Sequence, residues 1–339
     1  MAYKVLLVDD SRVALFVLKK MLSYSPEIEV VGTAQSGQEA LELIPLCQPD
    51  VICTDLHMEN INGEELTKII MERDPRPILV ISSSVQNEDK TNLFRLLEAG
   101  AIDFFAKPKA GLNPNNTELV QKLIRKIKIL SGVVPIRKRL TTRQLSPIQN
   151  APNNKIIIIG ASTGGPVAIK SILSQLPQNF PAAIICIQHI SKGFLQGFID
   201  WLSTSCKLPI KTMKIGEKPQ SGNVYFPLEG HHLQLSKDGT FYSNKGSLEN
   251  EHCPSISKAF QSAAQHYKKN TIAVLLTGMG DDGASGLKKV QLLGGVTIAQ
   301  NEESCIVFGM PQEAIKIGAA QHIVPLKEIP VILSNLIDK

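Results

Sequence analysis

Residues 156–166 read IIIIGASTGGP, and this stretch decides how the rest of the chain is interpreted. The four isoleucines have no polar face and are too few for a helix, so they predict a strand buried on both faces, as in a parallel sheet. The glycines after them predict a tight turn, and Pro166 suits the first position of a helix. Ser162 is therefore expected at the carboxyl end of a buried strand, where an open α/β sheet carries its functional groups.

Three interpretations of this glycine turn remain open at this point. Residues 160–164, GASTG, fit the G-x-S-x-G nucleophile elbow, which needs glycine because the turn is sharp and strained. They also resemble a dinucleotide-binding loop, and they fit a connection without chemistry equally well. The dinucleotide interpretation weakens after the next predicted strand, residues 182–187. Gln188 and His189 stand where an acidic residue would hold a ribose.

Length and composition are those of a soluble globular protein. The chain has 339 residues, of which 43% are hydrophobic and 20% charged, and this length suggests two domains. The first ten residues, MAYKVLLVDD, lack a basic segment, so neither a signal peptide nor a membrane span is expected. The six cysteines form no C-x-x-C pair and no metal-ligand spacing. They indicate reduced thiols and a cytoplasmic protein.

The positive net charge is not concentrated on a predicted helix or strand. The net charge is −3 over residues 1–130 and +4 over residues 155–339. The 24 residues between them, 131–154, also carry +4 and contain no acidic residue. This segment has three prolines and no lasting periodicity, which favours a solvated linker over a nucleic-acid-binding surface. No nucleic-acid partner is expected.

The first third of the chain alternates short buried strands with amphipathic helices. Strands are predicted over residues 4–8, 51–54, 78–81 and 102–105. The apolar stripe of the first intervening helix is assigned to Val13, Phe16, Val17 and Met21. A helix over residues 117–130 is expected to close the domain. This alternation predicts a doubly wound parallel sheet.

Polar side chains follow these strands where each one ends. They are Asp9 and Asp10, then Asp55, then Ser82, then Lys107. The carboxyl ends of parallel strands meet at one edge of a sheet, so these side chains should converge. Three carboxylates repel one another in one site, and a hard divalent cation such as Mg²⁺ relieves that repulsion. One carboxylate can then attack a phosphoryl group. A single aspartate at a strand end is more commonly a helix N-cap, so the prediction depends on the whole set.

Residues 1–125 closely resemble the receiver domain of bacterial two-component response regulators, which is flavodoxin-like. The resemblance implies that Asp55 accepts a phosphoryl group from a histidine kinase. It also implies Mg²⁺ ligands in Asp9, Asp10, Asp55 and the main-chain carbonyl of His57, a switch hydroxyl in Ser82 and a phosphate-facing lysine in Lys107. After Asp55 the chain departs from the usual D-x-x-M-P pattern, because Glu59 replaces the proline.

The remainder of the chain brings a hydroxyl, an imidazole and a carboxylate to strand ends. Ser162 follows one strand, His189 follows the strand over residues 182–187, and Asp282 lies in a second glycine turn after a strand over residues 271–276. A lone histidine is more commonly structural, but this one stands at a strand end. Serine needs a base to take its proton, and a carboxylate fixes the tautomer of that base. Glycine turns at helix N-termini supply N–H donors for an oxyanion.

Other elements are predicted around these strands. Residues 194–202 suggest an amphipathic helix, and residues 208–243 alternate as strands do, with a hairpin over 233–243. A helix is expected from Pro254 to about Tyr267, and a last strand over residues 296–299.

Five segments resemble the catalytic domain of the CheB family of chemotaxis protein-glutamate methylesterases. They are GASTGGP, QHI, HCPS, LLTGMGDDGASGL and AQNEESCIVFGMP. The resemblance implies that Ser162 is the nucleophile, His189 the base and Asp282 the carboxylate of a triad, and that the main-chain N–H of Met279 lies in an oxyanion hole. Residues 225–232, YFPLEGHH, depart from the A-P-G that usually precedes the histidine.

This resemblance extends over nearly the whole chain and defines its expected organisation. A receiver domain over residues 1–125, a linker over 126–154 and an esterase domain over 155–339 are predicted. The esterase domain would be Rossmann-like, doubly wound and parallel, with an added β-hairpin.

The implied function is hydrolysis of glutamate methyl esters on methyl-accepting chemoreceptors, with release of methanol. Deamidation of receptor glutamines is implied as well, under control of phosphorylation and in the service of chemotactic adaptation. Mg²⁺ is expected for the receiver and no cofactor for the esterase. Two alternatives are a DNA-binding response regulator, which lacks a helix-turn-helix signal here, and a Rossmann-type oxidoreductase, which Gln188 and His189 disfavour.

Overall fold

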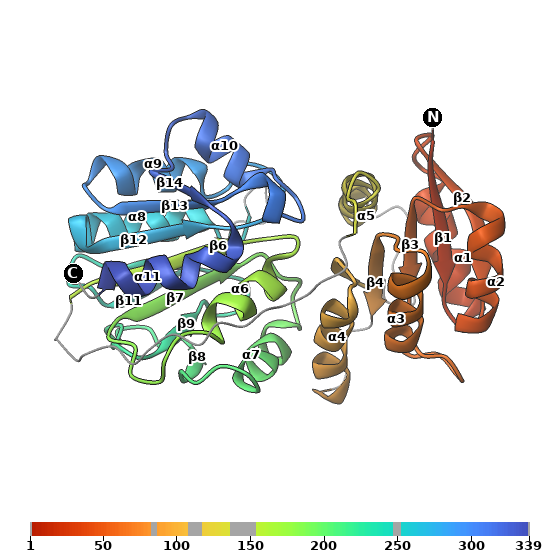
Figure 1. Cartoon of the computed structure of the whole chain (residues 1–339), viewed down its shortest axis with the longest axis horizontal. Coiled ribbons are helices and arrows are strands. Elements are labelled where there is room, and N and C mark those ends of the chain that lie inside the picture. Colours follow the sequence, from red (N-terminus) through yellow and green to blue (C-terminus); the bar gives the residue numbers. More distant parts are fainter. Residues whose placement is uncertain (1, 83–86, 108–116, 136–153, 247–251, 338–339) are drawn as a thin grey trace. The chain divides into compact units, whose positions relative to one another are not determined.

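The computed structural model describes residues 2–82, 87–107, 117–135, 154–246 and 252–337. The chain forms two compact units, residues 1–140 and 141–339, and each is built on its own parallel sheet (Figure 1). Two α/β sheets were predicted, and this fold class is confirmed. Within the described residues, every helix is too short or too polar to cross a lipid bilayer.

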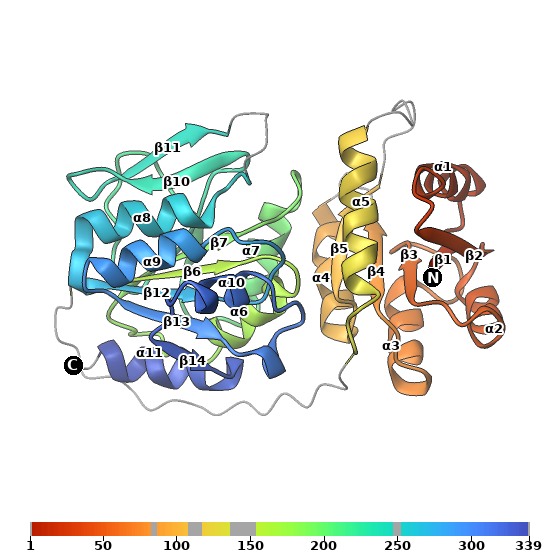
Figure 2. The same cartoon turned by 90° about the horizontal axis from the view of Figure 1, so that it is seen from above.

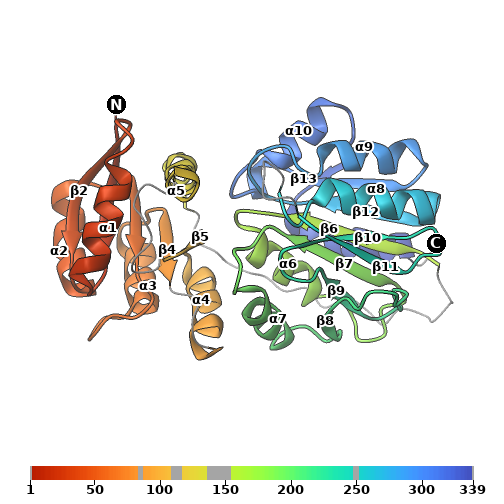
Figure 3. The same ribbon diagram turned by 180° about the vertical axis from the view of Figure 1, so that it is seen from behind.

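The first unit has five parallel strands in the order β2-β1-β3-β4-β5. The strands are β1 (Tyr3–Val8), β2 (Ile28–Ala34), β3 (Val51–Thr54), β4 (Ile78–Ser82) and β5 (Asp103–Ala106). The helices are α1 (Arg12–Leu22), α2 (Gly37–Cys47), α3 (Gly63–Arg73), α4 (Asn87–Ala99) and α5 (Thr117–Leu130). Helices α1 and α5 cover one face of this sheet, and α2, α3 and α4 cover the other (Figure 3).

Strand β2 was not predicted from the sequence. It is an edge strand, and only its first and last residues, Ile28 and Ala34, are buried. Its middle contains Glu29, which is exposed, and residues of intermediate burial. An edge strand needs less apolar surface than a central one, so its sequence lacks the continuous apolar run that reveals β1, β3 and β4.

The stripe assigned to helix α1 was wrong for Val13 and Phe16, whereas Met21 is buried as predicted. Val13 is 67% exposed and Phe16 is 68% exposed. The sheet is covered by Leu15, Leu18, Met21 and Leu22. Both stripes are apolar at helical spacing, so periodicity alone cannot decide which one faces the sheet.

Helix α5 continues to Leu130, and both Ile127 and Leu130 are buried in the first unit. We therefore propose to end the first domain at Leu130 rather than at residue 125. Most of the predicted linker, residues 136–153, lies outside the described residues.

The second unit has seven parallel strands in the order β14-β13-β12-β6-β7-β9-β8. They are β6 (Ile156–Ala161), β7 (Ala183–Gln188), β8 (Ile210–Thr212), β9 (Val224–Phe226), β12 (Thr271–Leu275), β13 (Val296–Gln300) and β14 (His322–Val324). Separately, β10 (His231–Leu235) and β11 (Phe241–Lys245) form the predicted antiparallel hairpin. Strand β6, the isoleucine run, is central and fully buried.

Helices cover both faces of this sheet, and the hairpin adds a further layer. The helices are α6 (Gly165–Leu173), α7 (Leu195–Ser203), α8 (Ile256–Tyr267), α9 (Ala284–Leu292), α10 (Met310–Lys316) and α11 (Ile329–Ile337), with 3-10 turns η1 (Lys268–Asn270), η2 (Glu302–Ser304) and η3 (Leu326–Glu328). Helices α8 and α9 cover one face, and α6 and α11 the other (Figure 2). The hairpin packs on the outer side of α8.

Three elements near the C-terminal end were not predicted, namely β14, α10 and α11. Helix α8 also begins at Ile256 rather than Pro254, because Ser255 is its N-cap. The Ser255 hydroxyl accepts a hydrogen bond from the main-chain N–H of Lys258 at 3.3 Å.

The strand order brings three predicted turns together. Strand β6 pairs with β12 on one side, where Gly160 lies opposite Leu275, and with β7 on the other, where Ala161 lies opposite Gln188. The turns after these three strands therefore leave the same edge of the sheet side by side.

Gly160 allows helix α8 to approach this edge closely. A Cβ atom added to Gly160 would lie 2.3 Å from Cγ2 of Ile256, the first residue of α8. No side chain larger than hydrogen fits there unless the side chain of Ile256 or the whole of α8 moves. The glycine of the predicted nucleophile elbow is thus required by the packing of a helix nearly one hundred residues later in the chain.

We expect Gly160→Ala to destabilise the second unit by about 1–3 kcal/mol through overpacking. Trp201 is the only tryptophan and is buried in this unit, so its fluorescence during urea unfolding measures the effect directly. An unchanged unfolding midpoint would show that α8 does not constrain this position.

Candidate active site

The Ser162 turn is held by main-chain bonds on both sides. The N–H of Ser162 donates to the carbonyl of Thr277 at 3.1 Å, and the carbonyl of Ser162 accepts from the N–H of Gly165 at 2.8 Å. Gly164 has a φ of +75°, in the left-handed region that glycine adopts without a steric penalty. Ser162 is half-buried at the N-terminus of α6, as the sequence predicts.

A buried polar network fixes the second glycine turn against the first. The Thr277 hydroxyl lies 3.0 Å from the carbonyl of Thr163 and accepts the N–H of Val307 at 2.9 Å. The side chain of Gln300, which is fully buried, accepts the N–H of Thr277 at 2.9 Å. A Cβ added to Gly278 would lie 2.7 Å from Cβ of Ser162. The second turn therefore passes directly beside the serine.

His189 is positioned at the end of the neighbouring strand β7. Its main-chain N–H donates to the carbonyl of Ala161 at 3.0 Å. The side-chain amide of Gln188 donates to the carbonyl of Ser162 at 2.8 Å and to that of His189 at 2.9 Å. Gln188 is 2% exposed, so one buried amide group joins the backbones of the two residues.

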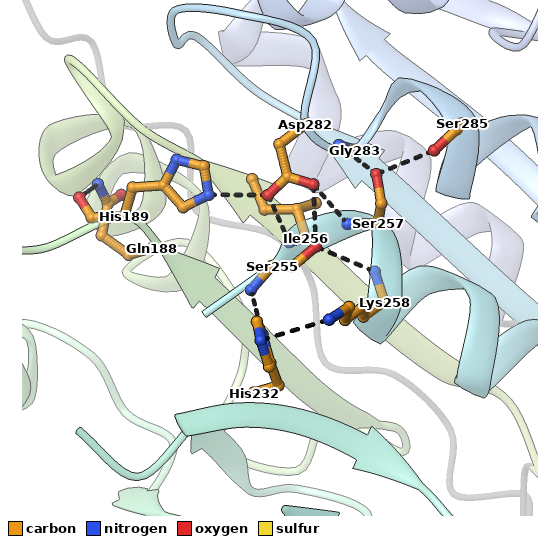
Figure 4. Close-up of polar contacts among 10 residues, drawn as sticks. All are labelled: Gln188, His189, His232, Ser255, Ile256, Ser257, Lys258, Asp282, Gly283 and Ser285. Carbon is orange, nitrogen blue, oxygen red and sulfur yellow. Dashed lines mark hydrogen bonds and ion pairs between the residues drawn. The ribbon is translucent and has the colours of Figure 1, made fainter. Parts of the chain in front are cut away.

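Asp282 accepts four hydrogen bonds at the N-terminus of helix α8 (Figure 4). Its Oδ2 lies 2.9 Å from Nε2 of His189 and 2.8 Å from the N–H of Ile256. Its Oδ1 accepts the Ser255 hydroxyl at 3.1 Å and the N–H of Ser257 at 2.9 Å. The structure thus brings His189 and Asp282 into direct contact.

The charge of Asp282 is stabilised by these donors. Burial alone would raise the pKa of this carboxyl, but the hydrogen bond from His189 and the N–H groups of Ser257 and Ile256 outweigh burial. The pKa of Asp282 is therefore held well below its ordinary value of 3.8. An ionised carboxylate at this point also faces the positive end of the α8 dipole.

These contacts define which nitrogen of His189 can act as a base. Since Nε2 donates to Asp282, Nδ1 is the nitrogen that remains free to accept a proton. Among the described residues, no side-chain hydrogen bond joins Ser162 to His189. Catalytic hydrogen bonds are often long or poorly aligned without substrate and tighten when it binds. Met279 lies half-buried in the turn that passes Ser162, and its role remains a prediction.

Four further residues of this site were not predicted to have a role. Gln188 was noted only because it is not acidic, and its bridging amide depends on the register of β6 and β7. Ser255 and Ser257 donate hydrogen bonds to the carboxylate of Asp282. The S-x-S pattern at the start of a helix could have suggested a capping role for this segment. The ring of His252 stacks on that of His189, with ring centroids 4.5 Å apart.

The first unit contains the predicted acidic cluster. Asp9, Asp10 and Asp55 each place one carboxylate oxygen within 4.8 Å of the other two. Nζ of Lys107 lies 2.6 Å from Asp9 and 3.0 Å from Asp55. Ser82 is buried at the end of β4, and its carbonyl accepts the N–H of Lys107 at 2.7 Å.

Burial and mutual charge shape the pKa values of this cluster. Burial raises the pKa of Asp55, Lys107 lowers it and Asp9 raises it, and the net shift is upward. Burial lowers the pKa of Lys107, but its bonds to Asp9 and Asp55 outweigh burial and raise it overall. A hard divalent cation prefers oxygen ligands, so it fits these three carboxylates. Asp10 is exposed, so the cluster is open to solvent and an ion can enter it. His57 is exposed as well, and its carbonyl ligand remains a prediction.

Comparison with known proteins identifies both units. The sequence model of the CheB methylesterase family matches residues 157–333, and that of the response regulator receiver domain matches residues 5–116. A protein-glutamate methylesterase/protein-glutamine glutaminase of Nitrosospira multiformis is 37% identical, over 98% of this chain and 96% of its own. One of Thermotoga maritima is 36% identical over 98% of each chain.

A solved structure supports the same relation. The crystal structure of the Thermotoga maritima CheB methylesterase catalytic domain is 40% identical, with a TM-score of 0.52. It covers 54% of this chain, and 98% of that domain is matched.

We expect Asp282→Asn to lower the free energy of unfolding by about 2–4 kcal/mol at neutral pH, because an amide cannot accept all four hydrogen bonds. The folded-state pKa of Asp282 is depressed, so its stabilisation is present above about pH 4 and is lost as the pH falls through the depressed value. Urea unfolding from pH 7 to pH 2 should therefore show a smaller acid loss in the variant than in the wild type.

Asp281→Asn is the matched control, since Asp281 is the exposed neighbouring carboxylate. Equal destabilisation by both variants would contradict the assigned role of the Asp282 contacts.

Proposed function

This chain belongs to the CheB methylesterase family and carries a response regulator receiver domain, and on that basis we propose that it is a phosphorylation-regulated serine esterase that removes methyl groups from glutamates of chemoreceptors. The products are a glutamate side chain and methanol. Deamidation of receptor glutamines by the same site is part of the proposal. The observation that carries it is the contact of His189 with Asp282 beside the Ser162 turn.

The proposed reaction begins with attack of Ser162 Oγ on the ester carbonyl, while Nδ1 of His189 takes the hydroxyl proton. Asp282 holds the tautomer with its proton on Nε2 and stabilises the imidazolium. Main-chain N–H groups of the glycine turns, including that of Met279, receive the oxyanion. The tetrahedral intermediate collapses, methanol leaves with the proton from His189, and an acyl group remains on Ser162.

Hydrolysis then completes the cycle. A water molecule attacks the acyl group and gives one proton to His189. When the second tetrahedral intermediate collapses, His189 returns that proton to Ser162 Oγ, and glutamate and the free serine are released. A glutamine substrate forms the same acyl group with ammonia as the leaving group. The ester and the amide therefore differ only in their first half-reaction.

In the first unit, Asp55 is the proposed phosphoacceptor, with a chemotaxis histidine kinase as donor. Asp9, Asp10 and Asp55 would hold Mg²⁺, which when bound neutralises charge that develops on the transferred phosphoryl oxygens. Lys107 and Ser82 would then contact the phosphoryl group. We propose a cytoplasmic location because all six cysteines are free thiols.

Regulation is proposed to act by occlusion. Asp55 and Ser162 belong to different compact units, so a charge change at Asp55 must reach the esterase through a surface of the receiver. We propose that the unphosphorylated receiver restricts access to Ser162 and that phosphorylation relieves this restriction. A docking preference of a few kcal/mol is sufficient.

Ser162→Ala should reduce methanol release from methylated chemoreceptor membranes by several orders of magnitude, since losing a triad nucleophile removes the covalent pathway. Phosphorylation of Asp55 should persist. Ser174→Ala, at the C-terminus of α6, is the control and should keep native turnover. Near-native turnover by Ser162→Ala would rule out the serine mechanism.

Asp55→Asn should take up no label from a small radioactive phosphodonor in the presence of Mg²⁺, because the amide cannot form an acyl phosphate. The wild type and the surface variant Asp74→Asn should both be labelled, and chelation of Mg²⁺ should abolish that labelling. Stoichiometric label on Asp55→Asn would assign the phosphoryl group to another residue.

A fragment of residues 151–339 should release methanol faster than the unphosphorylated full chain, because the restricting receiver is absent. Its circular dichroism and urea unfolding establish that it is folded. The full chain should approach the rate of the fragment when phosphodonor and Mg²⁺ are added. A folded fragment that is no faster than the unphosphorylated chain would exclude simple occlusion.

A further inference from the structure

The β10–β11 hairpin contacts helix α8 through a buried histidine. His232 lies on β10 and is 2% exposed. Its Nδ1 accepts the main-chain N–H of Ser255 at 3.1 Å. Nζ of Lys258 lies 3.5 Å from the other ring nitrogen, Nε2. Because Nδ1 is the acceptor in this contact, the ring must carry no proton on that nitrogen.

Ser255 connects this contact to the catalytic carboxylate. Its hydroxyl donates to Oδ1 of Asp282 at 3.1 Å and accepts the N–H of Lys258 at 3.3 Å. Oδ2 of the same carboxylate bonds His189 at 2.9 Å. Figure 4 shows the resulting chain of contacts from His232 through Ser255 and Asp282 to His189.

His232 satisfies a donor that the helix leaves free. Ser255 is the N-cap of α8, so its own N–H has no partner within the helix. Without the imidazole, that buried N–H must find another acceptor, and movement of the Ser255 backbone carries its hydroxyl away from Asp282. Displacement of a catalytic group by about 1 Å can cost roughly 100-fold in rate.

We infer that His232 is a positioning residue of the esterase: it fixes Ser255 and thereby holds Asp282 in the orientation that sets the tautomer of His189. The β10–β11 hairpin is then part of the catalytic machinery, although it belongs to neither parallel sheet. This inference rests on the proposed esterase function.

The hairpin also contacts α8 at places other than His232. A substitution of His232 can therefore change the position of Ser255 while the hairpin stays folded. Leu233, Leu235 and Phe241 are buried in the core that also contains Ala259 and Phe260 of α8. A second hydrogen bond joins the N–H of Leu235 to the hydroxyl of Ser262 at 3.1 Å. Ser262 lies further along α8 than Ser255 does. Ser262→Ala removes a hairpin–helix hydrogen bond without touching Asp282, so it is a matched control.

Two substitutions of His232 test whether the site needs a hydrogen-bond acceptor at the position of Nδ1 or only a side chain of similar volume. The side-chain oxygen of asparagine is attached to Cγ, as Nδ1 is, and can accept the N–H of Ser255. The amide of glutamine is attached one carbon further out, so its oxygen lies near the position of Nε2. His232→Gln should therefore fail where His232→Asn succeeds.

The experiment measures kcat and KM for methanol release by the full chain with phosphodonor and Mg²⁺. His232→Gln should lower kcat by about 10- to 100-fold with little change in KM, and His232→Asn should restore most of it. Ser262→Ala should stay within about twofold of the wild type. Equal rates for the glutamine and asparagine variants, or an equal loss in Ser262→Ala, would overturn the inference.

A second readout does not depend on activity. Imidazole ¹⁵N spectra of the same proteins should show His189 as the tautomer protonated at Nε2 in the wild type and in His232→Asn. A mixture of tautomers is expected in His232→Gln. If the glutamine variant keeps the wild-type tautomer, His232 does not position Asp282. An inactive wild type with these spectra would refute the proposed function alone.

Discussion

The carboxylate of Asp282 on the first turn of α8 is the contact on which the second unit depends. It accepts two main-chain N–H groups, one hydroxyl and one imidazole, so it joins β7, the turn after β12 and the start of α8. Without this carboxylate, each of these donors would be a buried or half-buried polar group that lacks this hydrogen bond, which lowers the free energy of unfolding. Among these donors, the imidazole of His189 and the N–H groups of Ser257 and Ile256 keep the carboxylate ionised. The same contacts stabilise the fold and orient the imidazole.

Both units place their chemistry at the carboxyl edge of a parallel sheet, but charge is handled differently in each. In the first unit, Lys107 lies between two carboxylates, Asp9 and Asp55, and the pKa of Asp55 is still raised by burial. In the second unit, hydrogen-bond donors lower the pKa of Asp282.

The sequence predicts strand ends better than it predicts contacts between them. The isoleucine run of β6, the predicted strand over residues 182–187 and the glycine turns were sufficient to place Ser162, His189 and Asp282 at strand termini. That β7 and β12 are both neighbours of β6 is a property of the strand order, which local patterns do not encode. The bridging amide of Gln188 requires the register in which Ala161 lies opposite that residue.

The stripe of α1 shows a different limit. Two apolar stripes share one short helix, and both have helical spacing. Packing against the sheet, rather than the spacing, determines that Leu15 is buried and Phe16 is exposed. The His232–Ser255 contact is equally invisible, because it joins a hairpin to a helix cap 23 residues away. A buried histidine and a capping serine each have an ordinary local explanation, and only the fold joins them.

The central claim is that ester and amide substrates share one acyl group on Ser162. The direct measurement offers hydroxylamine as a competitor for water and compares two receptors that differ only in having glutamate methyl ester or glutamine at one position. The ratio of hydroxamate to glutamate formed there is read by mass spectrometry. The account predicts the same ratio from both receptors, because the leaving group has departed before the competition begins. Different ratios would show that water meets the substrate with its leaving group still attached, and would contradict the shared intermediate.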